Sequence, residues 1–245
     1  MNENKLIVAL DVDTPAKARN LVSQLRGIAG MFKIGSQLFT AAGPSLVREI
    51  VSSGERIFLD LKYHDIPNTV AQAGVEATRL GVSIFNIHAS GGSEMMRRTA
   101  DAVTECANNE GVARPLVIGV TALTSANAAS LAEVGINEAP DSLVSRLALL
   151  AKESGMDGVV ASPQEIAIVR SAVKSDRFVV VTPGIRPAGA DLFDQKRVTT
   201  PGEAVLAGAD YIVVGRPILS AEDPAATARQ IIAEMSTTGV GTAAI

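Results

Sequence analysis

Short runs rich in Val and Ile alternate with longer helix-like segments along the chain, and this alternation is what most constrains the fold. Such β-branched runs, bounded by turn residues, predict strands. The segments between them are typical of helices, because several end on Gly and Thr14-Pro15 forms a favourable helix start. The predicted strands span residues 5–11, 31–35, 56–63, 82–89, 115–121, 157–162, 178–185 and 211–216.

Eight strand–helix units in 245 residues predict an α/β protein with the (β/α)8 TIM barrel fold. The alternative is an open, doubly wound sheet, which would normally carry a G-x-G-x-x-G turn after the first strand. Here that strand continues as LDVDTPA (10–16), and no P-loop pattern occurs in the sequence either. We therefore predict a single barrel domain over residues 1–245, with residues 236–245 as a frayed tail.

Composition argues against several classes of function. The formal net charge is −4 and aromatic residues make up only 3%, which disfavours nucleic-acid or anionic-membrane binding. A single cysteine, Cys106, excludes an internal disulfide and a multi-thiolate metal site. No apolar run approaches the roughly 18 residues that span a bilayer, and the N-terminal residues do not resemble a signal peptide. We expect a cytoplasmic protein without nucleic-acid or membrane partners.

Polar residues fall at the C-terminal ends of nearly all the predicted strands. In a (β/α)8 barrel these ends meet on one face, where active sites are built. Two connections on that face, residues 121–140 and 183–203, are long enough to be lids or binding loops. The polar residues at the strand ends are Asp11, Lys33, Asp60, Lys62, Asn86, His88, Thr121, Thr124, Arg186 and Arg216.

Asp60 and Lys62 are the sharpest candidates for catalysis. Alternate residues of a strand share a face, so Phe58, Asp60 and Lys62 point to one side and the intervening leucines to the other. The charges then face the barrel mouth, beside Lys33 of the neighbouring strand. A buried ion pair is a poor source of stability, because desolvating both ions costs several kcal/mol. We therefore favour a functional reading over a structural ion pair.

A lysine between carboxylates is expected to stay protonated, because opposite charges favour the charged form. Such a group is a proton donor, whereas a Schiff-base lysine needs a lowered pKa. The local composition around Lys62 thus predicts general-acid or electrostatic chemistry.

Two Gly–Arg pairs predict an anion site. Gly184 and Arg186 follow the seventh predicted strand, and Gly215 and Arg216 end the eighth. Barrels commonly bind phosphate between these two loops, where Gly permits close backbone approach and Arg offers a planar fork. The pattern predicts a small phosphorylated substrate.

Two histidines, His64 and His88, raise the possibility of a metal. Their positions make a poor ligand set, so we predict no metal. Two alternatives remain open on the residues alone: a metal-dependent sugar-phosphate isomerase or epimerase, and a non-catalytic nucleotide-binding barrel.

The pattern D-x-K-x-x-D, formed by Asp60, Lys62 and Asp65, resembles the signature of the orotidine 5′-monophosphate decarboxylases. A related sugar-phosphate decarboxylase shares this pattern, but further motifs in the family's order extend the resemblance over nearly the whole chain. These motifs are ALD (9–11), FKIG (32–35), NIHASGG (86–92), VTALTS (120–125), TPGIRP (182–187), DQKR (194–197) and VGRP (214–217).

The resemblance implies cofactor-free decarboxylation of orotidine 5′-monophosphate to uridine 5′-monophosphate, a step of de novo pyrimidine biosynthesis. It implies that Lys62 protonates C6 of the pyrimidine as the carboxylate leaves, while Asp60 lies against that carboxylate. Lys33 would hold Asp60 and a ribose hydroxyl, and Asp11 would bind the ribose.

For the rest of the substrate, the resemblance implies that Thr124 contacts the pyrimidine. Gln195, Arg216 and the backbone near Gly215 would bind phosphate, and Arg186 would belong to the same closing loop. It further implies a homodimer.

In that homodimer, Asp65 and Thr69 would reach into the active site of the second subunit. One short stretch, residues 58–69, would then serve both catalysis and dimerisation.

Overall fold

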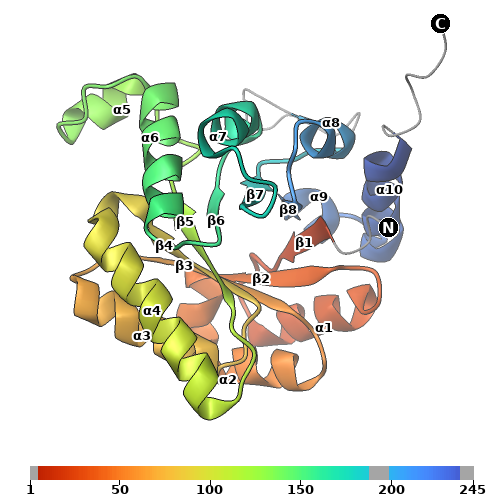
Figure 1. The fold of residues 1–245 in the computed structure, drawn as a ribbon. Helices are drawn as coiled ribbons and strands as arrows, with labels where there is room; N and C mark the ends of the chain where they lie inside the picture. The colour runs from red at the N-terminus through yellow and green to blue at the C-terminus, as the bar shows by residue number, and fades with distance from the viewer. Residues whose placement is uncertain (1–4, 188–198, 238–245) are drawn as a thin grey trace, which may run out of the picture.

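A computed structural model describes residues 5–187 and 199–237, and within this part of the chain eight parallel strands close into a barrel (Figure 1). Each strand pairs with its neighbours in chain order, and β8 returns to pair with β1. The strands are β1 (Leu6–Ala9), β2 (Met31–Gly35), β3 (Ile57–Tyr63), β4 (Ile84–His88), β5 (Leu116–Val120), β6 (Gly158–Val160), β7 (Val179–Pro183) and β8 (Tyr211–Val214). All lie within the predicted runs, so the (β/α)8 TIM barrel is confirmed.

Helices follow the strands and cover the outside of the barrel (Figure 1). The main ones are α1 (Pro15–Leu25), α2 (Ser36–Ser52), α3 (Pro67–Arg79), α4 (Gly92–Glu110), α6 (Pro140–Glu153), α7 (Ile166–Val173), α8 (Pro201–Leu206) and α10 (Pro224–Thr237). Shorter ones are η2 (Ala89–Gly91), α5 (Ala128–Glu133), η3 (Pro163–Glu165) and α9 (Arg216–Leu219).

The helix ends match their local sequence. The hydroxyl of Thr14 accepts a hydrogen bond from the Lys17 N–H, and Pro15 opens α1 as predicted. At the other end of the chain, α10 runs to Thr237 and thus includes the first two residues of the predicted tail. The remaining residues of the predicted tail, 238–245, lie outside the described part of the chain.

Strand alternation divides the apolar residues into two layers. A small cluster fills the barrel interior and includes Ile7, Phe58 and Val213. A much larger cluster lies between the strands and the helices and includes Val8, Leu59 and Val180. Because Phe58 faces inward, Asp60 and Lys62 further along β3 are directed to the barrel mouth.

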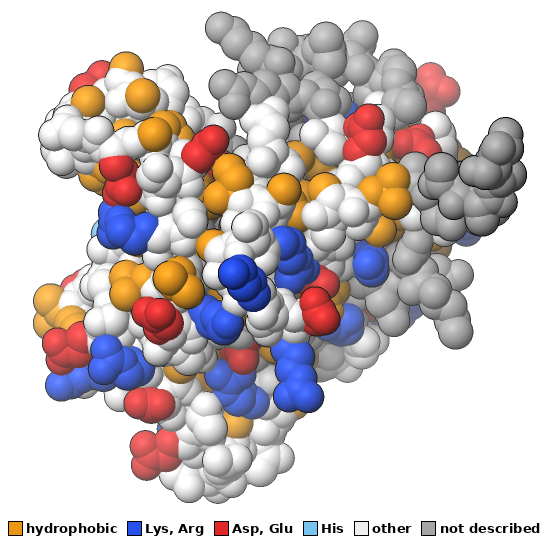
Figure 2. Space-filling model, turned by 45° about the horizontal axis from the view of Figure 1, so that its top comes forward, with side chains coloured by type: hydrophobic (Ala, Val, Ile, Leu, Met, Phe, Trp, Pro, Cys, Tyr) orange, Lys and Arg blue, Asp and Glu red, His pale blue; other side chains and the backbone are white. Residues whose placement is uncertain are grey.

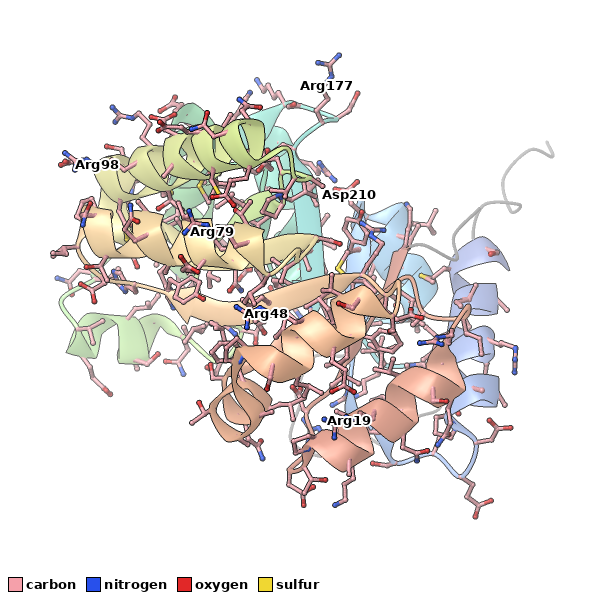
Figure 3. All side chains as sticks on the ribbon, turned by 90° about the horizontal axis from the view of Figure 1, so that it is seen from below. Arg19, Arg48, Arg79, Arg98, Arg177 and Asp210 are labelled. Carbon is pink, nitrogen blue, oxygen red and sulfur yellow. The ribbon has the colours of Figure 1, made fainter. Side chains whose placement is uncertain are left out.

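At the opposite end of the barrel, two carboxylates tie neighbouring strands together. Asp157, just before β6, accepts hydrogen bonds from Val117 N–H at 2.7 Å and Arg114 Nη1 at 2.8 Å. Asp210 (labelled in Figure 3), just before β8, accepts in the same way from the N–H of Val180 on β7 and from Arg170 Nη2, at 2.7 and 2.6 Å. These two acids complete the strand pairing at this end of the barrel, so their role is structural.

Ion pairs also link neighbouring helices on the exterior. Arg19 on α1 (labelled in Figure 3) donates two hydrogen bonds to Glu49 on α2, at 2.7 and 2.9 Å. Arg79 on α3 (labelled in Figure 3) donates two hydrogen bonds to Glu110 on α4. On the face shown in Figure 2, acidic side chains lie among the Lys and Arg side chains, so that face presents no continuous basic field. In the described ranges, the helices are too short or too polar to cross a membrane.

Replacing Gly158 by Ala should strongly destabilise the barrel. A Cβ at this position of β6 would lie 2.2 Å from the carbonyl oxygen of Val179, its partner in the ladder with β7. Since the obstacle is backbone, relief requires the strands to separate, and we expect a loss of about 3 kcal/mol or more in urea unfolding. Gly119→Ala is the matched control, because its new Cβ would have ordinary contacts of 3.4 Å and beyond. Equal stability of the two variants would contradict the packing described here.

Candidate active site

A cavity of about 280 Å³ opens at the C-terminal mouth of the barrel. Apolar residues from the strands form part of its wall, and charged residues from strand ends form the rest, which is the usual build of a small-molecule site. Its lining consists of Ala9, Asp11, Lys33, Phe58, Asp60, Lys62, Thr124, Val160, Val181, Pro183, Gly184, Arg186, Val213, Gly215 and Arg216.

Four charged side chains of alternating sign form a continuous chain along this wall. Lys62 Nζ donates to Asp60 Oδ1 at 2.5 Å, and Lys33 Nζ lies 3.3 Å from Asp60 Oδ2. Lys33 Nζ also donates to Asp11 Oδ1 at 2.9 Å. The side chains of Lys33 and Asp60 are only 10% and 13% exposed, whereas that of Lys62 is 35% exposed. The structure thus brings together the four charges that the sequence placed at the mouth.

Asp60 is held in its ionised form. Burial by itself would raise the pKa of this carboxyl group. The cations of Lys33 and Lys62, together with hydrogen bonds from Lys62 and Asn86, outweigh that effect and bring the pKa below its usual value. At neutral pH the cavity therefore contains a fixed anion between two ammonium groups.

The backbone of β3 departs from regular strand geometry at Lys62. This residue has φ of 52°, in the left-handed region, and the register between β3 and β4 shifts between Leu59 and Tyr63. For a residue with a Cβ, this conformation costs on the order of 1 kcal/mol. The Lys62 N–H donates to the side-chain oxygen of Asn86 at 2.8 Å. Strand alternation correctly predicted that Lys62 faces the mouth, but not this departure from regular geometry.

Two Gly–Arg pairs complete the lining of the cavity, from the ends of β7 and β8. Gly184 and Arg186 after β7, and Gly215 and Arg216 after β8, all line the same cavity. Gly184 has φ of 82°, which a side chain would disfavour. A Cβ on Gly215 would lie 3.4 Å from Ala9 and 3.7 Å from the Asp11 carboxylate, so the backbone here comes close to the charged wall.

Residues 4–231 match the model of a family described as "Orotidine 5'-phosphate decarboxylase / HUMPS family". The chain belongs to this family. It is 54% identical over 233 residues to the orotidine 5'-phosphate decarboxylase of Syntrophotalea carbinolica, covering 95% of each chain. It is 53% identical over 231 residues to that of Geobacter sulfurreducens, covering 94% of this chain and 95% of the relative.

Solved structures agree with this assignment. The crystal structure of orotidine 5'-phosphate decarboxylase from Lactobacillus acidophilus superposes with a TM-score of 0.83 at 36% identity, covering 94% of this chain and 98% of the other. A conserved protein of Geobacillus kaustophilus, described as uncharacterized, gives a TM-score of 0.80 at 36% identity, with coverages of 94% and 99%. The family resemblance inferred from the motifs is confirmed.

Not every residue suggested by the decarboxylase resemblance reaches the cavity of its own chain. Thr124 lines it, from the loop after β5. Asp65 and Thr69 are exposed and lie outside its lining; an oxygen of Asp65 instead accepts the neighbouring Ile66 N–H at 2.6 Å. Gln195 falls outside the described residues.

The two histidines of this decarboxylase-family chain lie side by side. Their rings are 5.2 Å apart between centroids and tilted by 32°. Burial, then the proximity of His64 and Lys62, lowers the pKa of His88, which favours its neutral form. Among the described residues, no group of three or more His, Cys, Asp or Glu side chains is placed to hold a metal ion.

Sequence reasoning noted Asn86 as polar but did not include it among the site residues. It is fully buried on β4, and its Nδ2 donates to Asp60 Oδ1 at 2.7 Å. The available signal was an amide side chain inside the apolar run VSIFNIHA (82–89), on the same strand face as inward-pointing Ile84.

Proposed function

We propose that this carboxy-lyase removes CO2 from orotidine 5′-monophosphate and releases uridine 5′-monophosphate, as a step of de novo pyrimidine biosynthesis. The observation that carries the proposal is the alternating chain of Asp11, Lys33, Asp60 and Lys62 in a cavity that two Gly–Arg pairs also line. The activity for which the similar proteins are named supports it. The enzyme acts without a metal or organic cofactor, in the cytoplasm, where a buried free Cys106 stays reduced.

Lys62 is the proposed general acid. As the bond between C6 and the carboxylate breaks, the electron pair stays on C6 and CO2 leaves. The ammonium of Lys62 stabilises this developing charge and then transfers a proton from Nζ to C6, after which solvent reprotonates the amine. Because Asp60 holds the ammonium at 2.5 Å before substrate arrives, little reorganisation is needed during the reaction.

The other charges orient the substrate. Asp60 lies against the departing carboxylate. Because Asp60 is ionised, its negative charge repels that carboxylate and destabilises the bound substrate relative to the transition state. Lys33 holds Asp60 and a ribose hydroxyl, while Asp11 binds the ribose. The paired contacts of Lys33, to Asp60 and to Asp11, support this assignment.

Binding of the remote phosphate supplies energy for closing the site. Arg216, Gln195 and the backbone near Gly215 bind the phosphate, and Arg186 belongs to the same closing loop. Thr124 contacts the pyrimidine from the loop after β5. The binding free energy of the phosphate group can thus drive loop closure, which brings the charged residues around the reacting carbon.

The functional unit in this proposal is a homodimer, with Asp65 and Thr69 serving the partner's site. Both residues are exposed and neither lines the cavity of its own chain, which supports a role across an interface. The proposal requires no nucleic-acid or membrane partner.

Mixing two inactive variants should restore activity if the site is shared. In a dimer of one Lys62→Ala and one Asp65→Ala subunit, one site carries both defects and the other carries none. Random exchange should therefore recover about one quarter of wild-type activity in a two-fold dimer. Lys62→Ala mixed with Lys33→Ala is the control, because both residues serve the same chain's site and no intact site forms. A Lys62→Ala and Asp65→Ala mixture as inactive as its components would refute the cross-subunit role.

The function is tested with protein dialysed against chelator and mixed with orotidine 5′-monophosphate. We expect the near-UV absorbance of the substrate to disappear at an undiminished rate, and added Mg²⁺ or Zn²⁺ to leave that rate unchanged. Turnover of a sugar phosphate that chelator abolishes would instead indicate an isomerase or epimerase. Tight nucleotide binding with no turnover would indicate a binding protein, and either result would overturn the proposal.

A further inference from the structure

Asn86 connects two members of the charged wall without reaching the cavity. Its side chain lies on β4 with no exposed surface, and it does not line the pocket. Both ends of its amide are used: Nδ2 donates to Asp60 Oδ1 at 2.7 Å, and Oδ1 accepts the Lys62 N–H at 2.8 Å. A single neutral side chain therefore contacts both the acid and the backbone of the base.

The bond to Lys62 falls where the backbone is strained. Lys62 has φ of 52°, and the ladder to β4 is interrupted between Leu59 and Tyr63. The side-chain oxygen of Asn86 accepts the Lys62 N–H at the residue where the ladder shifts. A partly buried N–H that loses its acceptor costs about 1–3 kcal/mol, so removing Asn86 would favour a return to a regular strand conformation. Such a return would redirect the ammonium.

The bond to Asp60 orients the carboxylate. Oδ1 accepts from both Asn86 and Lys62, which leaves Oδ2 facing Lys33 at 3.3 Å. Because the Asn86 amide is neutral, it fixes the carboxylate plane without adding a third cation to the wall. An acidic residue at position 86 could not donate this bond while ionised.

We infer that Asn86 is a positioning residue, which keeps Lys62 in its left-handed conformation and orients Asp60 so that the ammonium is directed at the reacting carbon. It acts through these two residues and does not touch the substrate. This inference rests on the proposed decarboxylase function. If Asn86 only stabilised the barrel, its substitution would lower stability but would leave the pH dependence of turnover unchanged.

Three variants test the inference with orotidine 5′-monophosphate as the probe. Asn86→Ala should lower kcat roughly 10- to 1,000-fold with KM changed less than about threefold, because misplacing the acid affects the transition state more than binding. Thr182→Val is the control for a buried polar substitution on another strand: its hydroxyl has no hydrogen-bond partner among the described residues, and kcat should be unchanged.

Asn86→Asp provides the decisive readout and preserves the shape of the side chain should Asn86→Ala fail to fold. Two carboxyl groups at 2.7 Å would share a proton, and the pKa of the pair would rise. The protonated form can again donate to Asp60, so kcat relative to wild type should increase as pH falls through that raised pKa. The inference would be overturned if the ratio of the Asn86→Asp kcat to the wild-type kcat did not change with pH. It would also be overturned if the kcat values of the Asn86 variants lay within about threefold of the wild-type kcat.

A second readout separates failure of this inference from failure of the proposed function. If the wild-type protein does not turn over the substrate, the proposed function has failed, and the positioning role is read from amide hydrogen exchange. In Asn86→Asp, which keeps an acceptor, the Lys62 N–H should remain protected. In Asn86→Ala it should exchange roughly tenfold faster or more, with the N–H of Leu59 unchanged. Unchanged protection of Lys62 in Asn86→Ala would overturn the inference.

Discussion

Lys62→Ala is expected to leave the barrel folded and to reduce turnover of orotidine 5′-monophosphate by about four orders of magnitude or more. The estimate combines two losses: a positioned general acid contributes roughly 10²–10⁴-fold, and a preorganised charge at the developing anion contributes roughly 10²–10³-fold. The position of Lys62 supports a loss of turnover of this size, because its Nζ lies at the cavity wall, 2.5 Å from Asp60. Release of CO2 from labelled substrate measures it.

A matched lysine distinguishes loss of this function from loss of charge in general. Lys17 on α1 also pairs with an aspartate, Asp13, but both side chains are more than 60% exposed, at 63% and 61%. Lys17→Ala should therefore turn over at the wild-type rate. Thermal melting and uridine 5′-monophosphate binding check that Lys62→Ala stays folded with an intact pocket. A loss smaller than about 100-fold would remove Lys62 from the role of acid.

Asp60→Asn should reduce turnover by about three orders of magnitude while the protein still folds. The carboxylate orients both Lys33 and Lys62 through contacts of 3.3 and 2.5 Å, and an amide offers neither ammonium a countercharge. Loss of such a preorganised group typically costs about 10²–10³-fold, and displacing both lysines adds to that loss. Steady-state kinetics should show the change mainly in kcat.

The same substitution predicts a specific pH dependence of stability. Because the pKa of Asp60 is lower in the folded protein than its ordinary value of 3.8, its ionisation stabilises the fold above that ordinary value. This contribution is lost as pH falls through the lower, folded-state pKa. The unfolding free energy of wild type relative to Asp60→Asn should therefore be constant near pH 7 and decrease below about pH 4. Urea unfolding at pH 7 and pH 3 measures it, and a relative stability that increases at low pH would contradict the ion network.

Most of the fold could be predicted because each strand has a recognisable local sequence pattern. The eight Val- and Ile-rich runs contain the eight observed strands, and Thr14-Pro15 predicted the start of α1. The long connection after β5 was predicted as a binding loop or lid, but the short helix α5 within it was not. That helix begins at a capping box in which Asn127 and Ser130 bond reciprocally, and this pairing of short polar side chains is difficult to distinguish from an ordinary turn.

The charged wall could be predicted because strand alternation directs Asp60 and Lys62 to one face. Asn86 was not included, because one of its partners is the backbone N–H of Lys62, a residue in the left-handed conformation. A period-two pattern contains no information about that conformation. The roles proposed for Asp65 and Thr69 rest first on the family resemblance, and their exposure outside the cavity lining of their own chain agrees with it.

Reaction in D2O is the sharpest test of decarboxylation with proton delivery to C6. Chelator-treated protein is mixed with orotidine 5′-monophosphate, and CO2 and the nucleotide product are measured together. This mechanism predicts CO2 and uridine 5′-monophosphate in equal amounts, with deuterium at C6 of the pyrimidine. It also predicts that Lys62→Ala forms neither product at a comparable rate. Consumption of the substrate without an equal amount of CO2, or binding without turnover, would contradict it.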